Sequence, residues 1–272
     1  MKIIRRKKDL NKLINKINSF SFVPTMGGLH KGHESLIKKA KKINKNVLVS
    51  IFVNPKQFNS KNDYKTYPRN LRKDIKILKK LKIQYLYYPK YRDIFLFKTK
   101  NNIYLHSFSK KLCGKHRPGH FNGVLNVINR LLEQLRPKYI CLGKKDFQQL
   151  TLIKKHIEKN KINTSIISCK TLRDRNSLPY SSRNFNLSKN DKLLASKVFN
   201  LIRNEKIFIK RNKIKKINLT NTYKKIINLG IRKIDYIKPI NLDSLKNAKK
   251  FSENFNIFSA FYVGKVRLID NF

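Results

Sequence analysis

Two histidines three residues apart are the first side chains in the sequence with clear chemical potential. His30 and His33 stand in the sequence His-Lys-Gly-His, shortly after Gly27 and Gly28. The glycines allow the backbone to turn tightly and approach a ligand, and a helix beginning here would direct its free N–H groups to the same place. A single histidine is more often structural, but two at one strand–helix junction favour a phosphate-binding site.

A second group of polar residues follows a later apolar run. The stretch 143–149 reads Gly-Lys-Lys-Asp-Phe-Gln-Gln. Asp146 could simply cap a helix, with the lysines solvated. Alternatively, Lys145 could neutralise a phosphate group, and Gln148 or Gln149 could reach a substrate oxygen. The residues alone leave both interpretations open.

A third group, Ser-Ser-Arg-Asn at 181–184, offers two hydroxyls and a guanidinium fork suited to phosphate oxygens. By itself it would more often be an ordinary loop, but with the other two groups it could form a third wall of one site. The chain has no GxxxxGK[ST] P-loop and no GxGxxG fingerprint, which disfavours P-loop phosphate binding and ordinary dinucleotide binding. Cys113 is better explained as a loop or core cysteine than as a nucleophile.

Alternating apolar runs and amphipathic stretches indicate the elements that would position these groups. The run 47–53 is apolar almost throughout, as in a strand covered on both faces. Strands alternating with helices imply parallel βαβ units and a doubly wound, Rossmann-like α/β sheet, where ligands bind at the carboxyl ends of the strands. The predicted strands are 20–24, 47–53, 84–88, 139–142 and 165–169, and the predicted helices carry apolar stripes at 36–43, 71–81 and 124–135, with another after Asp146.

The pattern changes after about residue 184. Two helical segments, near 193–202 and 214–227, precede short strands near 231–237 and 257–263. We therefore expect a Rossmann-like catalytic domain over residues 1–184 and a smaller α+β domain over residues 185–272.

The strongest compositional feature is a formal net charge of +49, from 64 Lys and Arg residues against 15 Asp and Glu. Hydrophobic residues at 40%, with 17 Phe and 12 Tyr, exclude a disordered basic tail. The basic residues are spread over both halves, and 49 of the 64 are lysine, whereas base recognition favours arginine. A solvated basic surface is a better explanation than a dedicated nucleic-acid site.

Membrane and secreted classes are also disfavoured. No apolar run approaches the roughly 20 residues needed to cross a bilayer, and no apolar stretch follows the charged start as it would in a secretory leader. The cysteines, Cys113, Cys141 and Cys169, form no CxxC pair, so neither a disulfide framework nor a zinc site is indicated. We expect a cytoplasmic protein without a membrane partner.

The His-x-Gly-His sequence resembles the His-Ile-Gly-His signature of the nucleotidyltransferase superfamily, whose histidines hold ATP phosphates during adenylation. Six ordered motifs and the end of the chain resemble, more narrowly, the pantoate–β-alanine ligase family. They are the stretch 23–33, Ser-Ile-Phe-Val-Asn-Pro at 50–55 with Gln57-Phe58, Tyr-Pro-Arg at 67–69, Arg-Pro-Gly-His-Phe at 117–121, Lys-Asp-Phe-Gln-Gln at 145–149, Ser-Ser-Arg-Asn at 181–184 and Arg-Leu-Ile-Asp-Asn at 267–271. The resemblance covers almost all of residues 20–185 and thins beyond them.

The resemblance implies an ATP-dependent ligase that works in two steps. The carboxylate of (R)-pantoate would attack the α-phosphate of Mg-ATP, giving pantoyl adenylate and pyrophosphate. The amine of β-alanine would then attack the acyl carbon, giving pantothenate and AMP. The family further implies Mg²⁺ carried by ATP rather than by a protein metal site, a homodimer, and a smaller domain that acts as a lid against water.

The resemblance also assigns roles to residues of this chain. His33, with His30 beside it, would donate a proton or stabilise phosphate, and Lys145 would complete the catalytic group. Gln57 and Gln149 fall where the family binds pantoate, and Gln57 also lies near β-alanine. The ATP site would be lined by Met26, Gly27, Gly28, Leu29, His30, Lys31, Gly32, His33, Gly143, Lys144, Lys145, Asp146, Leu172, Tyr180, Ser181, Ser182 and Arg183.

Several positions depart from the family pattern. Members usually carry Glu at the position of Lys144 and often an acidic residue at that of Lys31. They commonly have an acidic-Gly pair where this chain has Asn176-Ser177, and Met or Leu where it has Tyr180. We expect the turn at Asn176 to accommodate left-handed geometry without glycine, and activity to persist.

Rival functions remain open from the residues. Another adenylating enzyme of the same superfamily is disfavoured by the Asn-Pro-x-Gln-Phe and Arg-Pro-Gly-His-Phe runs, which belong to the ligase rather than to ATP binding in general. A basic nucleic-acid-binding protein would show Arg and aromatic residues clustered on one face. A scaffold role would leave the polar residues at strand ends without a purpose.

Overall fold

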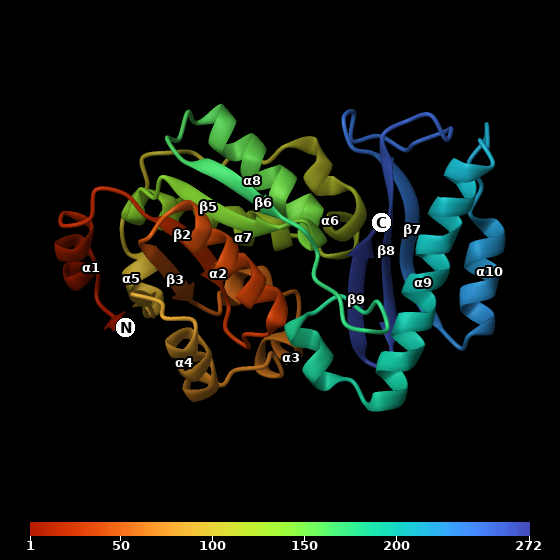
Figure 1. Cartoon of the computed structure of the whole chain (residues 1–272). Coiled ribbons are helices and arrows are strands. Elements are labelled where there is room, and N and C mark those ends of the chain that lie inside the picture. Colours follow the sequence, from red (N-terminus) through yellow and green to blue (C-terminus); the bar gives the residue numbers. More distant parts are fainter. The chain divides into compact units, whose positions relative to one another are not determined.

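The computed structural model describes residues 1–272, which divide into two units, residues 1–172 and residues 173–272 (Figure 1). The sequence pattern places the boundary later, between residues 184 and 185. Residues 173–184 pack with the second unit because Leu178 lies in its hydrophobic core and Arg173 forms an ion pair with Asp270 of its last strand.

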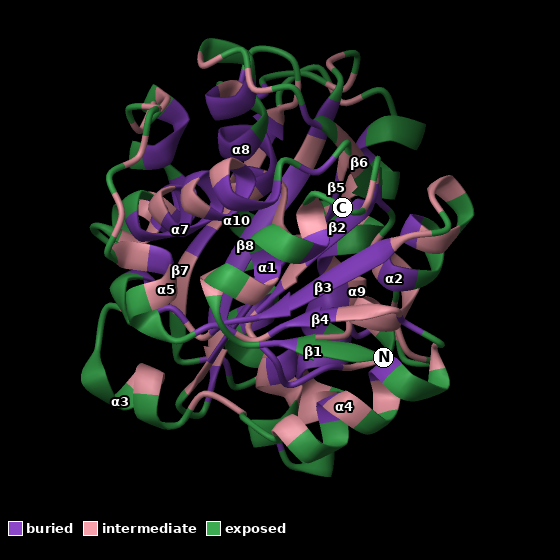
Figure 2. Ribbon diagram, turned by 90° about the vertical axis from the view of Figure 1, so that its left-hand side faces the viewer, coloured by how far each residue is buried: buried purple, intermediate pink, exposed green.

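Six parallel strands form the sheet of the first unit, in the order β1-β4-β3-β2-β5-β6. β3 is buried along its whole length, as expected of a strand covered by helices on both faces (Figure 2). The predicted parallel, Rossmann-like sheet is therefore confirmed. The strands are β1 Lys2–Ile4, β2 Ser21–Thr25, β3 Val47–Ile51, β4 Tyr85–Tyr87, β5 Tyr139–Gly143 and β6 Ser165–Cys169.

Amphipathic helices link these strands. α2 shows the pattern, because Ile37 and Ala40 are fully buried while Lys41 and Lys42 lie in the last turn, where cations interact favourably with the helix dipole. The α-helices are α1 Lys7–Ile14, α2 Lys31–Ile43, α3 Lys61–Lys65, α4 Leu71–Lys80, α5 Tyr91–Phe95, α6 Leu112–His116, α7 His120–Leu135 and α8 Phe147–Lys159. Short 3-10 turns cover Pro55–Gln57, Ser107–Lys110 and Lys144–Asp146.

The order of the strands reverses beside β2. The chain passes from β2 to β3 and β4 on one side of it, and later enters β5 and β6 on the other side. At such a reversal, the loops that follow the two central strands separate and leave a crevice at the carboxyl ends. The loops after Thr25 and Gly143 meet this condition, so the topology directs the residues that follow them to one place.

The second unit is a three-stranded antiparallel sheet, in the order β7-β8-β9, packed against two helices. Phe199 and Ile202 of the first helix and Phe261 of the middle strand lie in its core. The predicted smaller α+β arrangement is confirmed. The elements are α9 Lys189–Arg211, α10 Thr220–Asn228, β7 Lys233–Asn241, β8 Phe255–Val263 and β9 Val266–Asn271, preceded by a 3-10 turn at Ser182–Asn186.

Some element boundaries differ from the predicted ones. α9 begins earlier than predicted, because Ser188 and Asp191 form a capping box at its start. α10 begins later than predicted, at Thr220. The sequence pattern also missed β1 and α1, which are too short to show a clear period.

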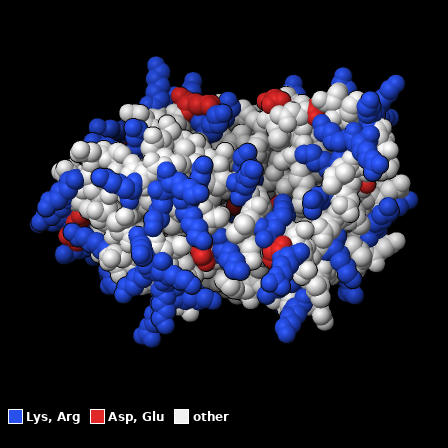
Figure 3. Space-filling view, viewed as in Figure 1, with Lys and Arg blue, Asp and Glu red and all other residues white.

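Basic side chains are distributed across the whole visible face of the molecule (Figure 3). This distribution agrees with the even spread of lysine along the sequence. No helix of the structure combines the length and the apolar character needed to cross a membrane.

Candidate active site

The two histidines lie side by side at the start of α2. The ring centroids of His30 and His33 are 4.1 Å apart. His30 is the N-cap residue, and its Nδ1 atom accepts a hydrogen bond from the backbone N–H of Gly32 at 3.1 Å. Because an accepting Nδ1 carries no proton, the proton of the neutral ring lies on Nε2. The Nδ1 atom of His33 is buried and has no hydrogen-bond partner, so this ring retains unused hydrogen-bonding capacity.

Both imidazole rings are neutral at physiological pH. Burial is the main cause that lowers the pKa of His30 to about 2, and the charges of His33 and Lys145 act in the same direction. Burial also lowers the pKa of His33, to about 4. The charge of Asp146 acts to raise this pKa, and the charge of Lys145 acts to lower it. The site therefore presents two uncharged N–H donors beside one ammonium group.

Lys145 and Asp146 reach this site from the turn between β5 and α8. Lys145 Nζ lies 3.6 Å from Asp146 Oδ1, and only 16% of the Lys145 side chain is exposed. The Asp146 side chain makes no capping hydrogen bond to α8, so a helix cap does not explain this residue. The effects of both charges on the pKa of His33 place them beside the histidines.

The turn that precedes the histidines is held by a residue from a distant helix. Asp74 of α4 accepts hydrogen bonds from the backbone N–H groups of Gly28 at 3.0 Å and Leu29 at 2.8 Å. Gly27 and Gly28 have positive φ angles of 80° and 60°, and a Cβ atom on Gly27 would lie 3.0 Å from the Asp74 carboxylate. Glycine is therefore required for both the backbone conformation and the close approach.

Sequence reasoning missed Asp74, although a signal was present. Asp74 falls on the apolar stripe of α4 between Leu71, Ile75 and Leu78, and it is 2% exposed. A lone carboxylate on the buried face of a helix requires polar partners elsewhere in the fold. Only the fold showed that those partners are the N–H groups of the glycine turn.

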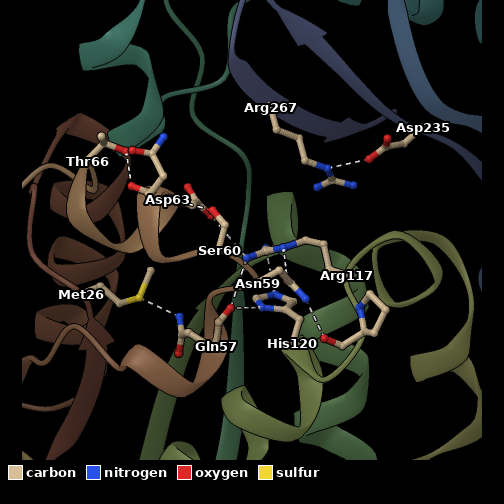
Figure 4. Close-up of polar contacts among 12 residues, drawn as sticks. Met26, Gln57, Asn59, Ser60, Asp63, Thr66, Arg117, His120, Asp235 and Arg267 are labelled. Carbon is tan, nitrogen blue, oxygen red and sulfur yellow. Dashed lines mark hydrogen bonds and ion pairs between the residues drawn. The ribbon is translucent and has the colours of Figure 1, made fainter.

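Gln57 lies in the same unit and is directed toward Met26 of this turn (Figure 4). Its side-chain amide contacts Met26 Sδ, and Asn54 Nδ2 lies 3.4 Å from Gln57 Oε1. The backbone carbonyl of Gln57 accepts hydrogen bonds from Arg117 at 3.2 Å and from His120 Nδ1 at 2.7 Å. Gln57 is thus held at both its side chain and its backbone.

The two motifs that distinguish the narrower family are packed against each other here. Asn54 Nδ2 donates to the backbone carbonyl of Gly123 in α7 at 3.0 Å. A Cβ atom on Gly123 would lie 2.2 Å from the carbonyl oxygen of Lys56, so only glycine allows this approach. The Asn-Pro-x-Gln-Phe and Arg-Pro-Gly-His-Phe segments therefore form one structural unit around Gln57.

The two adjacent glutamines of α8 differ in their hydrogen bonding. Gln148 is buried, and its amide donates to the carbonyls of Phe108 and Lys111 and accepts from the N–H of Cys113. Its hydrogen-bonding capacity is used within the protein. The half-buried Gln149 is not used in this way, so of the two it is the candidate for binding a substrate.

The remaining predicted residues are placed as follows. The side chain of Leu29 lies in the core of the first unit, so only its backbone can face a ligand. Lys31 and Lys144 are exposed, and Leu172, at the end of the first unit, is 40% exposed. Tyr180, Ser181, Ser182 and Arg183 belong to the second unit, where Ser181 Oγ accepts from the N–H of Arg183 at 3.3 Å.

The expected left-handed turn lies one residue further along the chain than predicted. Ser177 has a φ angle of 69°, whereas Asn176 is not among the residues with positive φ. Asp174 Oδ1 accepts hydrogen bonds from the N–H groups of Asn176 and Leu178, each at 2.9 Å, and these bonds stabilise the turn without glycine.

Comparison with known proteins shows the family to which the chain belongs. Residues 2–272 match the family model described as pantoate-beta-alanine ligase. The chain belongs to the pantoate–β-alanine ligase family. It is 43% identical over 266 residues to the pantothenate synthetase of Francisella tularensis subsp. novicida (strain U112), covering 96% of this chain and 92% of that protein. The corresponding protein of F. tularensis subsp. mediasiatica (strain FSC147) is 44% identical over the same length and the same shares of both chains.

Solved structures of pantoate–β-alanine ligases share the fold over the whole chain. A crystal structure of the F. tularensis pantoate-beta-alanine ligase, complexed with beta-gamma ATP and beta-alanine, matches with a TM-score of 0.85 and 42% identity, covering 100% of this chain and 97% of that one. The pantothenate synthetase of Thermus thermophilus matches with a TM-score of 0.92 and 26% identity, covering 100% of this chain and 99% of that one.

Proposed function

We infer that the protein is a pantoate–β-alanine ligase that condenses (R)-pantoate with β-alanine at the expense of ATP, giving pantothenate, AMP and pyrophosphate. Family membership over residues 2–272 and relatives that carry this activity in their names support the inference. The structural observation that carries it is the pair of neutral histidines beside Lys145 at the reversal of the sheet.

In the first step, a carboxylate oxygen of pantoate attacks the α-phosphorus of ATP. The bond from this phosphorus to the bridging oxygen of the β-phosphate breaks, and pyrophosphate leaves with the electron pair. No proton has to be transferred, so the protein contributes mainly position and charge neutralisation. In the second step, the uncharged amine of β-alanine attacks the acyl carbon. The bond from this carbon to the phosphate oxygen breaks, AMP leaves with the electron pair, and the nitrogen releases a proton to water.

We propose His30, His33 and Lys145 as the catalytic residues. The Nε2–H of His30 and the neutral ring of His33 would donate to phosphate oxygens, while the Lys145 ammonium would neutralise their charge. Because both rings are neutral, they would act as hydrogen-bond donors rather than as cations. Proton donation by His33 would require the bound phosphates to raise its pKa first.

We propose the following binding residues on the same basis. Gln57 and Gln149 would bind pantoate, with Gln57 also near β-alanine, because an amide can bond both hydroxyl and carboxylate oxygens. ATP would be bound by Met26, Gly27, Gly28, Leu29, His30, Lys31, Gly32, His33, Gly143, Lys144, Lys145, Asp146, Leu172, Tyr180, Ser181, Ser182 and Arg183.

We propose that Mg²⁺ arrives bound to the phosphates of ATP rather than at a metal site of the protein, as the family resemblance implies. We further propose that the enzyme acts in the cytoplasm as a homodimer, with residues 185–272 as a lid domain.

The test of this function is ATP–pyrophosphate exchange measured with and without (R)-pantoate. Exchange should depend on pantoate, because the adenylate forms only with the acid substrate. Addition of β-alanine should then release AMP and pantothenate in equal amounts. Exchange that ignores pantoate would favour another adenylating enzyme of the superfamily, and its absence from folded protein would contradict the proposed activity.

A further inference from the structure

The first residue of the second unit is held to the last strand of the same unit by a forked ion pair. Both terminal nitrogens of Arg173 donate to the carboxylate of Asp270 in β9, with NH2 3.1 Å from Oδ1. The Asp270 side chain has no exposed surface, while 22% of the Arg173 side chain is exposed. Moving Arg173 away would remove a cation from a buried carboxylate, which is strongly unfavourable. The pair therefore holds Arg173 in one place.

Arg173 also closes the turn that follows it. Its NH1 atom donates to the carbonyl of Ser177 at 3.1 Å, and its guanidinium lies 4.3 Å from the centroid of the Phe272 ring. Arg173 and Pro179 pair as an isolated antiparallel bridge. The two ends of the segment 173–179 thus meet at the residue that Asp270 anchors.

Further contacts bind the interior of this segment to the second unit. Leu178 is 2% exposed and lies in the hydrophobic core. Asp174 accepts the N–H groups of Asn176 and Leu178, and Asn200 of α9 donates to the carbonyl of Asn176 at 3.3 Å. The segment 173–179 has little freedom to change shape while these contacts persist.

The proposed ATP-binding residues of the second unit come directly after this anchored segment. Asn184 Nδ2 donates back to the carbonyl of Pro179 at 2.9 Å, which ties the 3-10 turn at Ser182–Asn186 to the end of the segment. The conformation of Ser181–Arg183 therefore depends on that of residues 173–179. A phosphate-binding loop held in one conformation loses less entropy when its ligand binds.

We propose that Arg173 and Asp270 are positioning residues that hold Ser181–Arg183 in the conformation that binds ATP. The inference rests on the proposed function, because it takes this segment to contact the nucleotide. Neither residue needs to touch a substrate. Their effect would reach the reaction through the turn and through the pairing of Pro179 with Asn184.

The test compares wild-type protein with Asp270→Asn and Arg173→Lys. Each variant keeps a polar group but loses the forked ionic contact. We expect the KM for ATP to rise about tenfold through lost preorganisation, with the KM values for pantoate and β-alanine nearly unchanged. Hydrogen–deuterium exchange should quicken in residues 174–183. Glu253→Gln is the matched control, because Glu253 accepts from Asn241 and from the N–H of Lys249 in a different loop of the same unit.

The outcomes separate this inference from the proposed function. A lower melting temperature with an unchanged KM for ATP would make the pair merely structural and overturn the inference. If Asp270→Asn does not fold, the same measurements on Arg173→Lys test the inference. Arg183→Ala tests the ATP contact itself, and an unchanged KM for ATP in this variant would refute the assigned site. Faster hydrogen–deuterium exchange in Asp270→Asn would still show that the ion pair anchors residues 174–183.

Discussion

Asp74 and Leu29 are 45 residues apart in the sequence, yet the Asp74 carboxylate accepts the backbone N–H of Leu29 at 2.8 Å. The other oxygen of the same carboxylate accepts the N–H of Gly28 at 3.0 Å. A buried side chain of α4 thus holds the turn from which His30 and His33 project. Burial raises the pKa of Asp74, although both hydrogen bonds act to lower it. The turn gains a fixed acceptor that no local residue supplies.

Asp74→Asn should destabilise the protein and weaken ATP binding. The asparagine amide can accept one N–H with its oxygen, but its NH₂ group would face the other N–H without an acceptor. We expect a loss of about 2 kcal/mol in the free energy of unfolding, measured by urea denaturation, and a higher KM for ATP. Asp93→Asn is the control, because Asp93 makes a comparable bond to the N–H of Lys90 on the exposed surface. Equal effects of the two substitutions would contradict this role of Asp74.

His33→Ala and His30→Ala should each slow adenylate formation with little loss of stability. Removing one hydrogen-bond donor to a developing negative charge typically lowers kcat by about 100-fold. Pantoate-dependent ATP–pyrophosphate exchange measures the rate, and a thermal melt measures stability. His106→Asn, which retains the acceptor that caps Phe108, serves as the control. A large fall in melting temperature with normal exchange would show that the histidines support the core rather than the ligand.

The lowered pKa values predict how acid affects folding. The pKa of His33 is about 4 in the folded protein, against 6.5 for an unperturbed histidine, so the unfolded chain binds more protons between these values. Stability should therefore fall as the pH drops from 6.5 toward 4. Replacing His33 with glutamine should remove part of this dependence, by about 1.5 kcal/mol between pH 6.5 and pH 5. Parallel stability–pH curves for the two proteins would be inconsistent with the lowered pKa.

Binding of ATP should raise the pKa of His33 back toward its ordinary value. The phosphates bring negative charge next to His33, which favours the protonated ring and raises its pKa. Titration of the histidine by NMR, with and without a non-hydrolysable ATP analogue, measures the effect. The resonance of His156, which is buried against Asn129 and Tyr104, provides an internal reference that ATP should not move. An unchanged His33 titration in the saturated complex would argue against phosphate contact.

Ser177→Gly should stabilise the protein. Ser177 adopts a φ angle of 69°, which costs a residue with a Cβ atom about 1 kcal/mol relative to glycine. Only its backbone carbonyl is used by Arg173, so the substitution keeps that contact. The free energy of unfolding should rise by somewhat under 1 kcal/mol, since glycine also makes the unfolded chain more flexible. Ser244 does not have a positive φ angle, so Ser244→Gly should instead lower the free energy of unfolding.

Local patterns predicted much of the fold and of the site. The apolar run at 47–53 became β3, because a strand buried on both faces must be apolar along its length. The doubly wound topology followed from the alternation of strands and helices. It placed His30, His33 and Lys145 at the ends of adjacent strands, where the structure has them.

Other features depend on contacts that no local pattern contains. The sequence could not distinguish Gln148 from Gln149. Neighbouring residues of a helix point about 100° apart, and only the packing of α8 decides which amide faces the core carbonyls. It also could not show that the Asn-Pro-x-Gln-Phe and Arg-Pro-Gly-His-Phe runs hold one another, since their contact depends on Gly123 approaching the backbone of Lys56.

The sequence by itself determined the family, the alternation of strands and helices after residue 20, and the residue types at the strand ends. These properties reside in short segments whose composition and spacing suffice to define them. The tertiary structure decided the protonation state of the histidines and the support of the glycine turn by Asp74. Both depend on burial and on charges brought together from distant segments, and burial exists only once the chain has folded.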